Sequence, residues 1–284
     1  MWAGTTGLMI ERRKEAVMIM KKVALIIAAA MVASLLAGCG GGSGVSGGSN
    51  ALALLLEATE AMKGTGGYRM RGDIEIGMGA GSAPIAMEIR ADVQNATDGM
   101  RQHMFVTMGG FEAEAYIVGD TYYQNTPGEG WRKMSLGLYK AQNMNMGLAD
   151  VDQVELMAKM AADSRILEEK DGRVGIAFHL GKEYFDASMQ AYRKYLEEGG
   201  QEVSPEWLDM IEGSVKDFGA DIRMWIGTTS GLIERMEIEY SMSGVPQVGE
   251  ITSSTRLDLY DHDQALEIEL PPEAARAEEI ELSP

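Results

Sequence analysis

An alternation of apolar and charged residues runs from position 68 to position 78 and limits the possible folds more than any other feature of the chain. Apart from Gly72, its even positions are Tyr, Met or Ile, while most odd positions are charged. A period of two is typical of a β-strand with one dry face. The same alternation returns over residues 85–93, after a turn at residues 79–82. So short a connection predicts an antiparallel pair, because parallel strands need a longer crossover.

Similar patterns predict strands on both sides of a helical middle section. The dipeptides Gly109-Gly110 and Asp171-Gly172 indicate tight hairpin turns. Further strands are expected at residues 102–108, 111–118, 121–125, 131–134, 164–169, 173–180, 215–226, 232–242 and 249–261.

Helical periodicity predicts helices at residues 51–63, 150–162 and 182–198, and a short one from Ser204. Asn50 is a plausible N-cap for the first. Its expected buried stripe is Leu52, Leu55, Leu56, Thr59 and Met62. Strands, helices and more strands indicate the α+β class: a curved antiparallel sheet of about eight to eleven strands, with helices packed on its concave face.

The N-terminal segment has the parts of a secretory signal. Lys21 and Lys22 precede an apolar run, residues 23–36, which leads into Leu36-Ala37-Gly38-Cys39. This last stretch resembles the bacterial lipobox, which implies cleavage before Cys39 and lipidation of its thiol. A transmembrane anchor is the alternative, but the run is shorter than the roughly 20 residues that a spanning helix needs. We expect residues 1–38 to be the signal peptide, with residues 1–19 arising from a misassigned start.

Charge limits how the mature chain can meet a membrane. Removing residues 1–38 removes five basic and two acidic residues and leaves 20 Lys+Arg against 41 Asp+Glu, a net charge of −21. Such a surface repels nucleic acid and anionic lipid head groups. Membrane attachment is therefore expected through the lipid on Cys39, at the extracytoplasmic face of the cell membrane.

The mature chain divides into three parts. Residues 39–50 comprise the lipidated cysteine and a Gly/Ser-rich flexible linker, residues 51–270 form one domain, and residues 271–284 form a loosely ordered acidic tail. Cys39 is the only cysteine, so the exported chain has no disulfide.

Two passages bear a family resemblance. Residues 118–123 with 130–134 (Val-Gly-Asp-Thr-Tyr-Tyr and Gly-Trp-Arg-Lys-Met) and residues 224–236 resemble hairpins of bacterial lipoproteins with the LolA-like, LppX-type half-barrel. The resemblance implies a hydrophobic cavity between sheet and helices that carries lipid, and no catalytic residue. It also implies an arginine that closes the cavity, for which Arg69, Arg71, Arg90 and Arg101 are all candidates.

Methionine stands out, with 22 residues, many on the expected dry faces. Its flexible thioether suits a cavity for varied acyl chains, and it equally suits an ordinary core. The expected ligand-binding residues are Met70, Ile74, Met87, Ile89, Phe105, Ile117, Met224 and Met236.

These features favour a non-enzymatic, cell-surface lipoprotein that binds a lipid or other apolar ligand. The alternative is an envelope interaction or sensing module with a filled core. We expect no cofactor, and no metal site because the three histidines lie in separate elements. The sequence names no protein partner.

Overall fold

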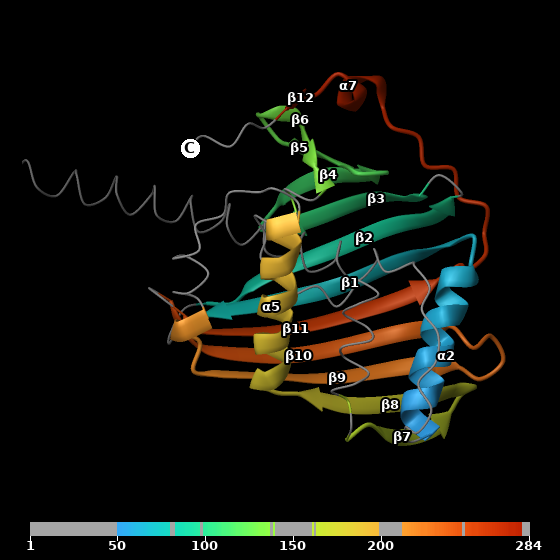
Figure 1. Cartoon of the computed structure of the whole chain (residues 1–284). Helices are drawn as coiled ribbons and strands as arrows, with labels where there is room; N and C mark the ends of the chain where they lie inside the picture. The colour runs from blue at the N-terminus through green and yellow to red at the C-terminus, as the bar shows by residue number, and fades with distance from the viewer. Residues whose placement is uncertain are drawn as a thin grey trace, which may run out of the picture.

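Twelve strands form one sheet in the computed structural model of the chain (Figure 1). The structure describes residues 50–79, 83–96, 99–136, 139, 161, 163–198, 212–245 and 248–279. The strand order is β12-β6-β5-β4-β3-β2-β1-β11-β10-β9-β8-β7. Neighbouring strands are antiparallel except for β12 and β6. The strands are β1 (Gly67–Met78), β2 (Ile85–Ala96), β3 (Gly99–Met108), β4 (Phe111–Val118), β5 (Thr121–Thr126), β6 (Gly130–Ser135), β7 (Arg165–Lys170), β8 (Arg173–Leu180), β9 (Asp217–Gly227), β10 (Ile233–Val245), β11 (Gly249–Tyr260) and β12 (Glu278–Glu279).

The first and the last long strands meet at the centre of this sheet. β1 pairs with β2 on one side and with β11 on the other, in a continuous register from Arg69 opposite Tyr260 to Met78 opposite Ile251. The meander β1–β6 thus continues directly into the meander β11–β7. Two runs of locally paired strands become one sheet because β11 returns to β1.

Tight turns connect many of these strands as the sequence predicts. Gly109 and Gly110 between β3 and β4 have φ values of 55° and 86°, and Asp171 and Gly172 between β7 and β8 have 52° and 73°. Positive φ at both central positions is the requirement of a two-residue hairpin turn that matches strand twist. Both predicted hairpins are confirmed.

Helices α2 (Asn50–Gly64) and α5 (Lys182–Glu198) lie over the same face of the sheet (Figure 1). α2 contacts β7 and β10, and α5 contacts β9. We name this helix-bearing side the inner face and the opposite side the outer face. The predicted fold class, a curved antiparallel sheet with helices on one face, is confirmed.

The buried side of α2 differs from the predicted stripe. Ala51, Leu55 and Ala58 are buried, whereas Leu52 and Leu56 are only partly buried. Leucines surround this helix, so periodicity alone did not fix its phase. The helix is described from Asn50 onward, one residue before the predicted start.

Residues 272–279, part of the expected loosely ordered tail, instead form a helix and a strand. Helix α7 (Pro272–Ala275) contacts β5 and β6, and β12 pairs with β6, Glu278 opposite Arg132. Ala274 is fully buried. These acidic residues extend the sheet beyond β6. The predicted helices at 150–162 and from Ser204 lie largely outside the described residues.

Candidate functional site

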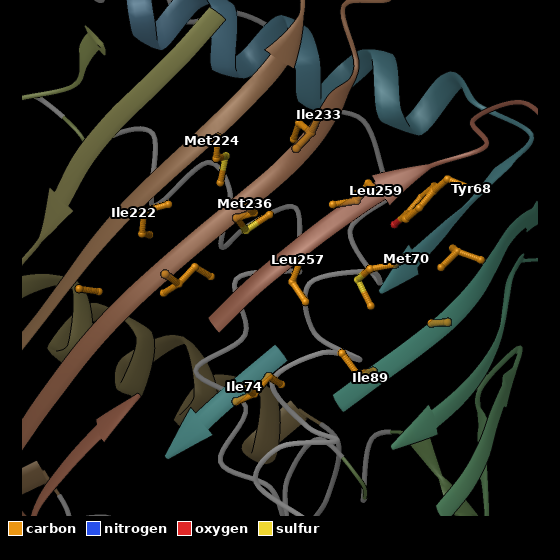
Figure 2. Close-up of a cluster of buried hydrophobic side chains, with 14 of the residues drawn as sticks. Tyr68, Met70, Ile74, Ile89, Ile222, Met224, Ile233, Met236, Leu257 and Leu259 are labelled. Carbon is orange, nitrogen blue, oxygen red and sulfur yellow. The ribbon is translucent and has the colours of Figure 1, made fainter. Parts of the chain in front are cut away.

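The two faces of the sheet differ sharply in chemistry. Along β1, Met70, Ile74 and Ile76 are buried on the inner face, while Arg71 and Asp73 alternate with them on the outer face. The same two-residue phase continues through β2, β9, β10 and β11. The inner face is therefore apolar across most of the sheet, and Figure 2 shows its central side chains projecting from neighbouring strands into one cluster.

Seven of the eight predicted ligand-binding residues lie together in this cluster. They come from β1, β2, β4, β9 and β10, which local sequence alone could not bring into contact. Five of them, Met70, Ile74, Ile89, Met224 and Met236, are labelled in Figure 2. The seven are Met70, Ile74, Met87, Ile89, Ile117, Met224 and Met236.

Phe105 was assigned to the wrong face. It alternates with the buried Met104 and Val106 of β3 and lies on the outer face. There its ring centroid lies 4.6 Å from that of His103, and the Arg90 guanidinium lies 5.3 Å from the Phe105 centroid. Phe105 therefore does not line an inner-face site.

The four arginines considered for closing a cavity also lie on the outer face. Arg69 bridges Asp92 at 3.4 Å and Asp261 at 3.1 Å, and Arg90 pairs with Glu112 at 2.9 Å. Arg71 lies over the ring of Tyr260. Arg101 donates a 3.5 Å hydrogen bond to the Ile268 carbonyl. All four side chains thus have their partners on the outer face.

A polar residue that sequence reasoning missed lies among the inner-face side chains. Gln102 of β3 is fully buried, opposite Val93 of β2 and Ile117 of β4. Neither its Oε1 nor its Nε2 has a hydrogen-bond partner among the residues that the structure describes. Its strand begins with the mixed run Gly-Met-Arg-Gln-His, in which no residue stands out in the sequence.

Tyrosines supply other polar groups in this interior. Tyr122 and Tyr139 stack with ring centroids 3.7 Å apart and planes inclined by 17°. Burial is the main cause that raises the pKa of both phenols, as it does for Tyr240 of β10. These hydroxyls stay protonated and neutral at physiological pH, so the tyrosines bring no charge to the inner face.

A pocket of about 340 Å³ lies on the other face. It is lined by Asp92, His103, Tyr116, Glu267, Ile268 and Glu269. The ring of His103 stacks on that of Tyr116, with the ring centroids 4.2 Å apart. The Nε2 atom of His103 lies 2.9 Å from Oε1 of Glu114. Burial, and then the charge and hydrogen bond of Glu114, raise the pKa of Tyr116 to about 12. Polar and acidic groups dominate this pocket, which does not suit an apolar ligand.

Two negative findings apply to the described part of the chain. Among those residues, no three His, Cys, Asp or Glu side chains are grouped so that they could hold a metal ion. No helix in the same ranges is long and apolar enough to cross a membrane. Cys39 and the signal segment lie outside the described residues.

Comparisons with known proteins find distant likenesses in structure only. No family model and no curated protein matches the chain. LprF from Mycobacterium bovis is 14% identical with a TM-score of 0.44, over 78% of this chain and 96% of that one. The Mycobacterium tuberculosis lipoprotein LppX is 14% identical with a TM-score of 0.37, over 78% and 100%. A LolA superfamily protein from Nitrosomonas europaea is 11% identical with a TM-score of 0.29, over 78% and 96%. LppX and the LolA superfamily protein carry the names that the sequence resemblance implies, and the likeness concerns the fold alone.

Proposed function

We propose that this chain is a cell-surface lipoprotein, anchored through lipidated Cys39, that binds a lipid or other apolar ligand at its inner face without catalysis. The observation that carries the proposal is the inner-face cluster itself. Seven predicted lining residues from five strands converge there, and four of the seven are methionines in addition to three isoleucines. Methionine adapts its shape to varied partners, so such a face can accept acyl chains of different outline.

Charge and position support the same function. The outer face carries ion pairs such as Arg235–Asp258 at 2.6 Å and Arg90–Glu112 at 2.9 Å. These charged groups keep the outer face hydrated. An apolar ligand would therefore partition to the inner face, where burial of apolar area gives about 25 cal/mol per Å².

An interaction or sensing module with a filled core is the second candidate. Its supporting observation is that the seven lining residues are each at most 7% exposed. Close packing without a ligand produces the same burial. The two functions differ in whether lipid changes the accessibility of inner-face groups.

Thiol labelling tests that difference, because the chain beyond Cys39 contains no cysteine. A general export signal without a lipobox would release residues 40–284, which keeps every element that the structure describes. We expect fatty acyl lipid to slow maleimide labelling of Met87→Cys, which lies on the inner face. The adjacent Glu88→Cys, on the exposed outer face, is the matched control. Equal labelling of Met87→Cys with and without lipid would favour the filled module.

The anchor is tested separately. Wild-type protein should incorporate labelled palmitate and sediment with membranes, whereas Cys39→Ala should not incorporate label. Label on the Cys39→Ala variant would show that the lipid is attached elsewhere.

A further inference from the structure

Gln102 is an exception to the apolar character of the inner face. Its side chain has 0% exposure, and its amide oxygen and nitrogen both lack partners among the described residues. Most buried polar side-chain atoms in proteins are hydrogen-bonded, so an unpaired amide needs a specific explanation.

The described residues around Gln102 give no structural reason for a polar side chain at this position. Met104 and Val106 follow it on the same face of β3, and Val93 and Ile117 lie opposite it on the two paired strands. All four are buried members of the apolar cluster. An apolar side chain of the same size would suit this position better for stability alone.

We propose that Gln102 is a ligand-binding residue that hydrogen-bonds the neutral polar group of an otherwise apolar ligand. This inference rests on the proposed function and narrows the ligand class. A primary amide offers two donor hydrogens and an acceptor oxygen, so it pairs with a hydroxyl or an ester.

The charge pattern separates a neutral from an ionised ligand group. The inner-face positions of β2, β3 and β4 that surround Gln102 carry no charged side chain within the described residues. A carboxylate or phosphate buried there would have no cation to offset its desolvation. The ligand is therefore an apolar chain with an uncharged hydrogen-bonding group, rather than a pure hydrocarbon or an anionic amphiphile.

A two-ligand, two-protein comparison tests the pairing. The released chain, residues 40–284, is loaded with the neutral dye N-phenyl-1-naphthylamine, which is then displaced by 1-dodecanol or by dodecane. Gln102→Leu keeps the approximate volume and removes both polar atoms. We expect Gln102→Leu to weaken dodecanol binding about tenfold and to leave dodecane binding unchanged or tighter, because one net hydrogen bond corresponds to up to about tenfold.

Two controls test whether the change in affinity comes from the loss of the Gln102 amide. Thermal unfolding without ligand should show Gln102→Leu at least as stable as wild type, since the variant removes an unpaired buried amide. Thr107→Val, on the outer face of the same strand, should leave both affinities unchanged. If Gln102→Leu unfolds, Gln102→Met provides the same comparison with a more flexible side chain.

The outcomes are distinct. Equal changes for dodecanol and dodecane, or no change for either, would overturn the role of Gln102 while leaving apolar binding intact. Failure of wild type to bind the dye and both ligands would overturn the proposed function itself.

Discussion

Met224 of β9 lies directly opposite Met236 of β10, and both side chains are buried in the inner-face cluster. This cross-strand pair places two flexible thioethers side by side on the apolar face. Directly opposed residues in an antiparallel pair have Cβ atoms about 5 Å apart, so the two side chains can adjust to one another and to a ligand.

Replacing both members of this pair tests the value of flexibility. The double substitution Met224→Leu with Met236→Leu keeps the volume and should cost less than about 1.5 kcal/mol in urea unfolding. Leucine is stiffer, so affinities for 12-, 16- and 20-carbon acyl chains should differ more from one another than in wild type. An unchanged spread of affinities would mean that the methionines are plain core residues.

Ile74 tests how much stability the inner face provides. It is 1% exposed at the centre of β1, between β2 and β11. Ile74→Ala should reduce the free energy of unfolding by about 2–5 kcal/mol, because it removes buried methyl groups and leaves a cavity. The exposed neighbour Glu75 is the control: Glu75→Ala should stay within about 0.5 kcal/mol. Similar losses for the two variants would contradict the assignment of faces.

The raised pKa of Tyr116 leads us to expect a loss of stability at alkaline pH. Burial and Glu114 raise its pKa from 10.0 to about 12 in the folded protein. The folded state therefore holds this proton more tightly than the unfolded state, and the resulting stability is complete below pH 10 and is lost as the pH rises from 10 toward 12. Tyr116→Phe should lose less stability than wild type between pH 10 and pH 12 in urea unfolding. Parallel losses in the two proteins would show that other buried tyrosines account for the whole effect.

A substitution that detaches the C-terminal segment should loosen the sheet locally rather than unfold the whole domain. Ala274 is fully buried where α7 meets β5 and β6. Ala274→Asp buries a carboxylate there, so we expect α7 to detach and β12 to leave β6. Hydrogen exchange should then become faster at residues 130–135 and remain slow in β1 and β11. Ala275→Asp, at an exposed position of the same helix, should leave exchange unchanged. Unchanged exchange in Ala274→Asp would mean that β6 does not depend on the segment.

Local alternation predicted most strands because a half-buried strand repeats every two residues, as in Tyr68 to Met78. It could not fix the phase of β3, where Met104, Phe105 and Val106 are consecutive apolar residues. Pairing with β2 decides that phase and sends Phe105 to the outer face. Sequence also could not predict that β11 returns to β1, because the paired residues are far apart in the chain, from Met78 with Ile251 to Arg69 with Tyr260, and no local pattern indicates this pairing. Gln102 escaped notice for a similar reason, since its burial depends on the strands on either side.

Lipid content of the exported protein tests the central claim most directly. The released chain, residues 40–284, would be purified without detergent and measured by native mass spectrometry, followed by solvent extraction and lipid identification. The account predicts a reproducible added mass of one apolar ligand per chain, which disappears on extraction and carries an uncharged hydrogen-bonding group. A clean ligand-free mass that stays unchanged after incubation with mixed neutral lipids would contradict it.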